Sequence, residues 1–269
     1  MQQQFAGRVC IVTGGTQGLG EATARLLAER GAEAVVVVGR NIERGRKVTA
    51  ALEQLGAKAH AIAADLGDMT AVGGIVGEAD RRFGRVDVLV NAAALTDRGS
   101  ILDSSPELFD RMFAVNVRAP FFLMQDAARI MRREGKGGTM VNILSTSGYG
   151  GQPFLAPYSA SKGALGILTR NAAYALMRDR IRINGLNIGW MDTPGEHGIQ
   201  KRAHDAPPDW LVKAEAGMPT GRLLKPAEVA RAIAFLASDE SGMMSGALVD
   251  FDQSVQGAGD PPRPMERLA

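Results

Sequence analysis

Residues 9–20 read Val-Cys-Ile-Val-Thr-Gly-Gly-Thr-Gln-Gly-Leu-Gly, a short apolar run followed by a glycine-rich turn. The run is typical of a buried strand, and residues 18–29 continue with a helical pattern. Glycines in such a strand-turn-helix unit let the backbone approach a pyrophosphate at the helix N-terminus. The spacing is GxxxGxG, and a simple tight turn is the alternative interpretation. We expect a dinucleotide site whose contacts include Gly14, Thr16, Gln17, Gly18, Leu19 and Gly20.

Short β-branched runs alternate with longer helical patterns along the whole chain of 269 residues. This alternation predicts parallel βαβ units, and therefore an α/β protein of one domain (1–269) with a Rossmann-type, doubly wound, seven-stranded parallel sheet covered by helices on both faces. The expected strands are 9–13, 34–38, 58–63, 86–91, 138–144, 181–187 and 247–251. The expected helices are 18–29, 41–55, 69–82, 106–133, 158–177 and 226–236.

Two segments depart from this alternation. Residues 190–222 contain four prolines and are predicted to be an irregular loop. A loop of that length in a compact domain is usually functional, so we interpret it as a substrate lid. The tail, residues 257–269, is rich in glycine and proline at its start and is expected to be loosely ordered.

Composition excludes several classes of function. Hydrophobic residues make up 45% of the chain, charged residues 22%, and the net charge is +2, which is typical of a globular protein. No run of lysine and arginine resembles a nucleic-acid footprint, and no apolar run is long enough to span a membrane. The single cysteine, Cys10, excludes an internal disulfide and fits the cytoplasm. The three histidines lack metal-ligand spacing, so we expect no catalytic metal.

A second motif, Tyr158-Ser-Ala-Ser-Lys162, lies in the helix expected at 158–177. A spacing of four places the phenol and the ammonium on one helix face, about 5–6 Å apart at Cβ. The cation there stabilises a phenolate, which makes Tyr158 usable as an acid or base. Together with the phosphate cradle, this pair indicates nicotinamide chemistry.

The end of the second expected strand bears on the choice of cofactor. It reads Gly39-Arg40-Asn41 and lacks the acidic residue that an NAD-selective site normally uses to bind the ribose hydroxyls. Arg40 can instead fork onto the 2′-phosphate of NADP, with Arg44 in the next helix as a weaker candidate. A solvated surface arginine is the alternative, and we expect NADP(H) over NAD(H).

Two further strand ends supply candidate cofactor contacts. Asp65 and Leu66 follow the third expected strand and are placed to contact adenine, although an aspartate in such a turn can also cap a helix. Asn91, Ala92 and Ala93 end the fourth expected strand, where small side chains leave room for a ribose.

These motifs, in this order and over nearly the full chain, resemble those of the classical short-chain dehydrogenase/reductase family. The matching positions are the turn at 13–20, Asp65, the segment 91–94, Asn116, Ser145 thirteen residues before Tyr158, and the pair Tyr158 and Lys162. The resemblance implies an NAD(P)-dependent alcohol dehydrogenase or ketone reductase and a homotetramer, with a homodimer as the alternative.

The resemblance also implies the roles of a catalytic tetrad. Tyr158 takes or gives the hydroxyl proton while a hydride moves between nicotinamide and the carbinol or carbonyl carbon. Lys162 lowers the pKa of the phenol and binds the nicotinamide ribose, Ser145 holds the substrate oxygen, and Asn116 supports a proton-relaying water. The alternatives are that Ser145 satisfies backbone groups after its strand and that Asn116 caps or kinks its helix.

The segment after the sixth expected strand departs from the family pattern. Ile188 replaces the usual proline, and it can still contact the nicotinamide through its backbone. Thr193 matches the threonine that meets the carboxamide. Both are therefore predicted cofactor contacts.

The substrate is predicted from the lid, which contains a mixture of residues that could stack on and hydrogen-bond a sugar or polyol: Trp190, His197, His204 and Trp210 with Glu196 and Asp209. Apolar anchoring of the lid with solvated histidines is the alternative. A second candidate is reduction of a 3-oxoacyl thioester, with a basic entrance for an acyl carrier; the candidate residues are Arg98, Arg129, Arg132 and Arg133. A third is a non-catalytic NAD(P)-binding sensor, which the intact tetrad disfavours.

Overall fold

The structure, a computed structural model, describes residues 3–255. Its seven strands form one parallel sheet in the order β3-β2-β1-β4-β5-β6-β7, which confirms the predicted fold. The strands are β1 (Val9–Thr13), β2 (Ala34–Gly39), β3 (Lys58–Ala63), β4 (Val88–Asn91), β5 (Gly138–Ser145), β6 (Ile181–Ile188) and β7 (Leu248–Phe251). The predicted tail, 257–269, lies outside the described residues.

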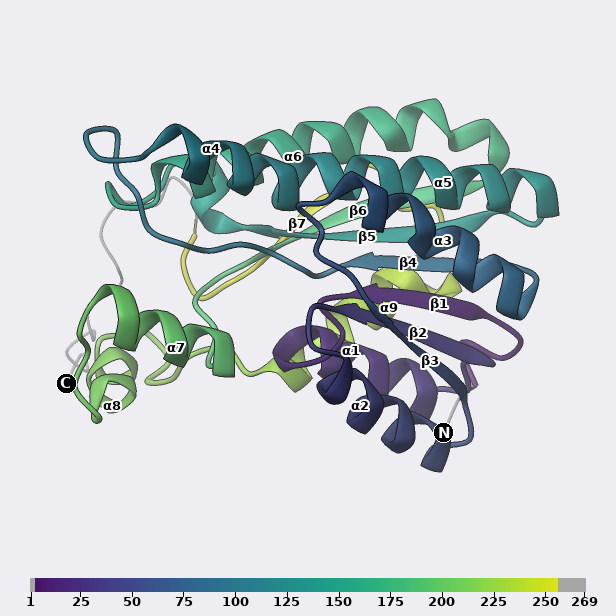
Figure 1. The fold of residues 1–269 in the computed structure, drawn as a ribbon, viewed down its shortest axis with the longest axis horizontal. Helices are drawn as coiled ribbons and strands as arrows, with labels where there is room; N and C mark the ends of the chain where they lie inside the picture. The colour runs from purple at the N-terminus through teal and green to yellow at the C-terminus, as the bar shows by residue number, and fades with distance from the viewer. Residues whose placement is uncertain (1–2, 256–269) are drawn as a thin grey trace, which may run out of the picture.

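Helices cover both faces of the sheet (Figure 1). One face carries α1 (Gly18–Glu29), α2 (Ile42–Gln54) and α9 (Pro226–Ala237). The other carries α3 (Met69–Phe83), α4 (Pro106–Phe113), α5 (Ala119–Glu134) and α6 (Ala156–Ala175). Within residues 3–255, no helix is both long enough and apolar enough to cross a membrane.

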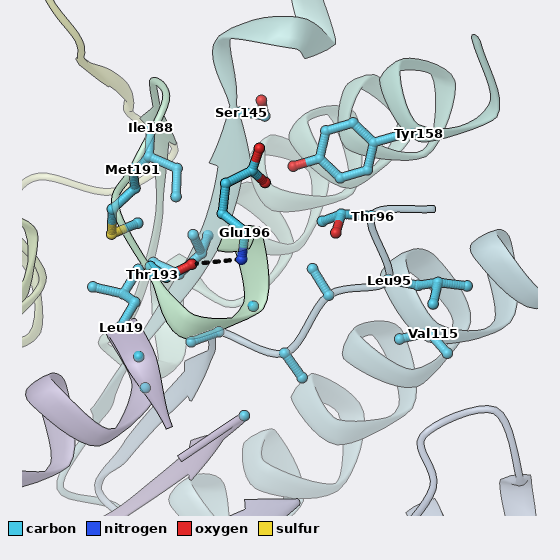
Figure 2. A pocket seen from close by; sticks show the side chains of 18 of the residues that line it. Leu19, Leu95, Thr96, Val115, Ser145, Tyr158, Ile188, Met191, Thr193 and Glu196 are labelled. Atoms are coloured by element: carbon cyan, nitrogen blue, oxygen red, sulfur yellow. Dashed lines mark hydrogen bonds between the residues drawn. The ribbon is translucent and has the colours of Figure 1, made fainter. Parts of the chain in front are cut away.

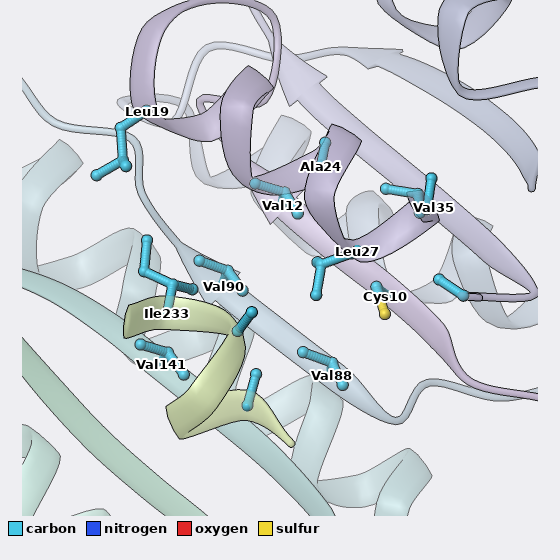
Figure 3. Close-up of a cluster of buried hydrophobic side chains, with 14 of the residues drawn as sticks. Cys10, Val12, Leu19, Ala24, Leu27, Val35, Val88, Val90, Val141 and Ile233 are labelled. Atoms are coloured by element: carbon cyan, nitrogen blue, oxygen red, sulfur yellow. The ribbon is translucent and has the colours of Figure 1, made fainter. Parts of the chain in front are cut away.

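The core follows from the two-residue period of the central strands. In β1, Cys10 and Val12 face α1 and α9, whereas Ile11 packs on the opposite face of the sheet. Figure 3 shows Cys10 and Val12 in one cluster with Leu27 of α1 and Ile233 of α9. Because both faces are covered, every residue of β1 is buried, and burial raises the pKa of the Cys10 thiol. Cys10 is therefore a packing residue.

The prediction of a single helix over 106–133 is wrong in one respect. A π-helical segment, Ala114–Arg118, separates α4 from α5. Such a segment inserts one residue per turn and commonly occurs at functional sites. It contains Asn116, whose side chain is bound to the loop that follows β4.

The prediction that 190–222 is irregular is also wrong. The segment contains α7 (Pro194–Ala203) and α8 (Trp210–Ala216). Thr193 caps α7, since its Oγ1 accepts a hydrogen bond from Glu196 N at 3.1 Å, and Pro194 occupies the first helical turn. Both signals are present in the sequence. In Figure 1, α7 and α8 lie beyond one end of the strands, away from the helices that cover the sheet.

Candidate active site

A cavity of about 670 Å³ lies at the carboxyl ends of the strands, within the range of small-molecule and cofactor sites. It spans the point between β1 and β4 where the strand order reverses, which is where open α/β sheets bind ligands. Most of the predicted site residues line it together: Gly14, Thr16, Gln17, Gly18, Leu19, Gly20, Arg40, Asp65, Leu66, Ala92, Ala93, Ser145, Tyr158, Lys162, Ile188 and Thr193. Asn91 and Asn116 are not among the lining residues.

The glycine-rich turn is held against the loop after β4. Thr13 Oγ1 accepts hydrogen bonds from Ala92 N at 3.1 Å and from Ala93 N at 3.2 Å. Gly14 has φ +67°, and a Cβ there would lie 2.9 Å from the Ala93 nitrogen. Glycine is therefore required at this position both by conformation and by space.

The turn also leaves an anion site at the start of α1. Gln17, the N-cap residue, makes no side-chain capping bond, so its side chain does not occupy the first N–H groups of the helix. The Gln17 amide oxygen accepts a hydrogen bond from Arg44 instead. These N–H groups, at the positive end of the helix dipole, fit the pyrophosphate of a dinucleotide.

The far end of the cavity carries the predicted adenosine contacts. Asp65 Oδ1 accepts a hydrogen bond from Gly67 N at 2.9 Å, and Oδ2 pairs with Arg111 at 3.0 Å. The backbone bond first, and then Arg111 and Arg40, lower the pKa of Asp65 despite the opposing effect of burial. Asp65 does not cap α3, because Asp68 holds that position. Arg40 is exposed at the rim.

Asn91 is placed differently from the prediction. Its side chain is buried and its Nδ2 donates to Asn142 Oδ1 at 2.9 Å. The amide therefore ties β4 to β5 inside the sheet. A cofactor contact by Asn91 stays a prediction, and from this position it would have to involve the backbone.

The reacting groups converge from two elements. Ser145 is the last residue of β5, and Tyr158 and Lys162 lie one turn apart on α6. The Lys162 ammonium is 5.7 Å from the centroid of the Tyr158 ring and donates a hydrogen bond to Ile143 O at 2.8 Å. The predicted shared face of Tyr158 and Lys162 is therefore observed.

Burial shifts the two ionisable groups in opposite directions. It lowers the pKa of Lys162 to about 8. It also raises the pKa of Tyr158, an effect strengthened by the charge of Glu196 and opposed by a hydrogen bond from Ser145 and by Arg98. Desolvation is the largest influence on Tyr158, and Lys162 donates to Ile143 O, so the predicted lowering of the phenol pKa by Lys162 stays a prediction.

Asn116 acts on the loop after β4. Its Oδ1 accepts a hydrogen bond from Leu95 N at 2.8 Å, and its Nδ2 donates to Leu95 O at 2.9 Å and to Ser161 Oγ at 3.0 Å. These bonds join the π-helical segment, the cavity wall at Leu95 and α6. The proton-relay role stays a prediction.

Two residues that the sequence analysis names as substrate-side candidates, one in the lid and one in the basic entrance, line the cavity. Glu196 on α7 and Arg98 in the loop after β4 both line the cavity, and their side chains are only 15% and 18% exposed. Figure 2 shows the carboxylate of Glu196 directed toward the hydroxyl of Tyr158, with Ser145 nearby. Thr96, Gln200 and His204 also line this part of the cavity. Of these, His204 is among the lid residues named from the sequence; Thr96 and Gln200 are not predicted, and polarity is their only signal in the sequence.

The proposed basic entrance is not assembled. Arg129, Arg132 and Arg133 lie near the end of α5, which leads into the amino end of β5, whereas the cavity is at the carboxyl ends of the strands. Each is paired with an acidic residue: Asp126 at 2.9 Å, Asp179 at 3.1 Å and Asp80 at 2.7 Å, in that order. Of the four candidate arginines, only Arg98 lines the cavity.

The lid helices are anchored through Asp192. Its Oδ2 accepts from Lys225 Nζ at 2.9 Å, and its Oδ1 lies 2.8 Å from His197 Nε2. Lys225 also pairs with Glu215 of α8 at 3.0 Å. These contacts connect α7, α8 and the start of α9, so the segment 190–222 is held to the rest of the fold; its role as a substrate lid stays a prediction.

Comparison with known proteins agrees with this site. A family model described as enoyl-(acyl carrier protein) reductase matches residues 14–254. A cis-4-hydroxycyclohexanecarboxylate dehydrogenase from Sinomonas cyclohexanicum is 37% identical over 253 residues, which cover 94% of this chain and 98% of that protein.

Two solved structures are similar over the whole fold. A short chain dehydrogenase/reductase family protein has a TM-score of 0.79 and 33% identity, with coverage of 93% of this chain and 98% of that one. An NAD⁺-bound xylitol dehydrogenase has a TM-score of 0.85 and 30% identity, with coverage of 92% and 98%.

Proposed function

The chain belongs to the classical short-chain dehydrogenase/reductase family, and on this premise we propose that it interconverts a small polyol and the corresponding ketone. Its activity as a nicotinamide-dependent alcohol oxidoreductase follows from that family and its relatives. The observation that carries the choice of substrate is the polar wall formed by Arg98, Glu196 and Gln200 beside Tyr158. A polyol offers hydroxyl groups to such a wall. A hydrocarbon or steroid skeleton would cover the polar groups of the wall without offering them hydrogen-bond partners.

Each residue of the proposed active site has a role that follows from its position. A bound nicotinamide supplies or accepts the hydride. Tyr158 takes the proton from the alcohol in oxidation and returns it in reduction, and Ser145 holds the reacting oxygen. Lys162 carries its charge beside the phenol and is placed to bind the ribose, while Asn116 positions Leu95 in the cavity wall.

We favour NADP(H) over NAD(H) as the cofactor. Arg40 stands at the end of β2, is exposed at the cavity rim and forms no hydrogen bond or ion pair with the residues in 3–255, so its guanidinium is available for a 2′-phosphate. Arg44, the weaker candidate, already donates to Gln17. The NAD⁺ bound to the similar xylitol dehydrogenase is a property of that protein.

The acyl-thioester alternative has less support. The description of the matching family model names an acyl-carrier reductase, which keeps this reaction as the second candidate. Recognition of an acidic carrier needs a basic entrance, and three of its four predicted arginines are paired near the end of α5. The sensor alternative is disfavoured because Ser145, Tyr158 and Lys162 line one cavity.

Assembly and location extend the proposal. The outer faces of α5 and α6 expose Phe121, Ile167 and Tyr174, with 41%, 66% and 82% of their surface accessible, and such faces suit subunit contacts. We place a homotetramer, or a homodimer, on these faces. We locate the protein in the cytoplasm, which suits its single buried cysteine.

The test is nicotinamide absorbance during incubation with polyols, aldoses, hydroxysteroids and 3-oxoacyl thioesters, each with NADP(H) and NAD(H). We expect turnover with polyols that is lost in Tyr158→Phe. Tyr174→Phe is the matched control, because this tyrosine lies on the same helix but is 82% exposed and outside the cavity lining. Turnover confined to acyl thioesters would replace the proposal with the second candidate, and tight cofactor binding without any turnover would favour a sensor.

A further inference from the structure

The side chain of Glu196 is not used by the helix that carries it. Thr193-Pro-Gly-Glu196 has the sequence of a capping box, in which the glutamate returns to the backbone N–H of the N-cap residue. Only half of the box forms: Glu196 N donates to Thr193 Oγ1, and the Glu196 carboxylate makes no bond to Thr193 N. The carboxylate turns into the cavity instead (Figure 2).

One oxygen of this carboxylate accepts all of its hydrogen bonds from residues 3–255. Glu196 Oε1 accepts from Trp190 Nε1 at 2.9 Å, from Gln200 Nε2 at 2.7 Å and from Arg98 Nη2 at 3.4 Å. Oε2 has no hydrogen-bond partner among residues 3–255. The carboxylate is therefore held in place through one oxygen and offers the other as an acceptor at the cavity wall.

Arg98 supplies donors next to that acceptor. Its Nε donates to His204 Nε2 at 3.1 Å and its Nη1 to Thr96 O at 3.0 Å, in addition to the Nη2 contact with Glu196. A guanidinium has five N–H groups, so these bonds leave donors available. The wall thus carries an acceptor oxygen without a partner among residues 3–255 and a guanidinium with unused N–H groups, and the opposite charges of the two side chains offset each other.

We propose that Glu196 and Arg98 bind a second hydroxyl group of the substrate, near the carbon that reacts at Tyr158. The inference rests on the proposed function and assigns the residues that select a polyol over a simple alcohol. A hydroxyl group both donates and accepts hydrogen bonds, so it can donate one to Glu196 Oε2 and accept one from Arg98 at the same time. A substrate carboxylate has no proton to give Oε2 and would face a like charge, and an ammonium group cannot accept from Arg98.

The test measures binding separately from turnover. The chain has two tryptophans, Trp190 and Trp210, whose rings stack with centroids 6.1 Å apart, and Trp190 donates to Glu196. Tryptophan fluorescence therefore reports on this wall. The titrations use the Tyr158→Phe protein with saturating oxidised cofactor, which prevents turnover, and four probes of one carbon skeleton: cis-1,2-cyclohexanediol, cyclohexanol, 2-aminocyclohexanol and 2-hydroxycyclohexanecarboxylate.

We expect the diol to bind about 10- to 100-fold more tightly than cyclohexanol, the range for a hydrogen bond to a charged group. Adding Glu196→Gln should remove most of this preference, because the amide keeps an oxygen for Trp190 and Gln200 but replaces Oε2 with a donor. Adding Asp209→Asn is the control, since Asp209 is an exposed lid carboxylate paired with Lys213. Circular dichroism and urea melting of each variant check that the lid remains folded.

Each outcome bears on one of the two proposals. Equal binding of diol and cyclohexanol, a preference that survives Glu196→Gln, or tighter binding of the amino or carboxylate probe would each overturn the inference. A Glu196-dependent preference for the diol in a protein whose native form turns over no polyol would support the inference as a binding site and overturn the proposed function. A protein that does not prefer the diol and turns over no polyol contradicts both.

Discussion

At the scale of single residues, chemistry here depends on burying ionisable groups next to one another. Lys162 is 3% exposed, and desolvation lowers its pKa to about 8. Desolvation raises the pKa of Tyr158 instead, so neither group has its usual protonation behaviour. Glu196 and Arg98 then act on the phenol with opposite sign.

The depressed pKa of Lys162 should cost stability below pH 8. Both the folded and the unfolded lysine are charged there, and only the folded one is desolvated, at a cost of about 3 kcal/mol for a shift of this size. As pH rises from 8 toward the unfolded value of 10.5, the folded lysine loses its proton first and the cost disappears. The free energy of unfolding of the wild-type protein should therefore rise as the pH increases from 8 to 10.5.

Lys162→Met should remove that dependence. We expect the variant to lose activity while its free energy of unfolding at pH 7 rises by about 1–3 kcal/mol, the unpaired Ile143 carbonyl offsetting part of the gain. Urea denaturation at pH 7 and at pH 10.5 checks this, and a difference between variant and wild type that does not shrink with pH would contradict it.

The charges around Tyr158 should move the pH profile of alcohol oxidation. Oxidation needs the phenolate, so a higher pKa of Tyr158 places the acid limb of kcat/KM at higher pH. Glu196 raises this pKa and Arg98 lowers it. Glu196→Gln should therefore shift the limb to lower pH and Arg98→Gln to higher pH.

The measurement is kcat/KM from pH 6 to 10 with one substrate for all variants. Asp209→Asn should leave the limb in place, because its exposed carboxylate pairs with Lys213 outside the cavity lining. Shifts of the same sign for Glu196→Gln and Arg98→Gln would show that the limb does not report on the phenol.

At the scale of elements, a π-helical segment and a capped α-helix shape two walls of the cavity. The π-helical segment Ala114–Arg118 places Asn116 where it bonds both backbone groups of Leu95. The capped helix α7 carries Glu196 to the opposite wall. The carboxyl ends of the strands thus form the base of the cavity, and these two helical segments position residues of its walls.

Asn116→Ala should loosen the wall at Leu95. It leaves a partly buried N–H and C=O of Leu95 without these partners, which should lower the free energy of unfolding by about 1 kcal/mol and reduce kcat, because Leu95 lines the cavity. Urea denaturation and steady-state kinetics check both effects. Ser161→Ala removes only one of the partners of Asn116 and should have a smaller effect; equal effects would mean that the bonds to Leu95 are not the important ones.

At the scale of the whole molecule, one cavity joins the two halves of the sheet. It is lined from Arg40, after β2, across to Thr193, after β6. A ligand that spans it contacts both sides of the switch point between β1 and β4. Cofactor binding should therefore stabilise the fold as a whole rather than one half.

Thermal unfolding should show this stabilisation and its cofactor preference. NADP⁺ at about 100 times its Kd should add about 2.7 kcal/mol, or about 5–10 °C in Tm for a chain of this size. NAD⁺ at the same concentration should add less, and Arg40→Gln should make the two cofactors equal. Arg46→Gln is the control, since Arg46 is paired with Glu43 outside the cavity lining; an unchanged NADP⁺ preference in Arg40→Gln would rule out the role of Arg40.

The α/β order, the glycine turn and the pair Tyr158 and Lys162 follow from the sequence by itself, because each depends on neighbours in the chain. Strand bounds differ from the predicted ranges by two residues at most, since apolar β-branched runs are local signals. The start of α7 has a local signal too, in Thr193 and Pro194.

Folding alone brings together groups that are distant in the chain. Arg98 and Glu196 are 98 positions apart and meet only because the loop after β4 and helix α7 face one cavity. The π-helical segment is held by such a contact, through Asn116 and Leu95. The direction of the Tyr158 pKa shift is likewise set by burial and by Glu196, because desolvation and charge act through space and not along the chain.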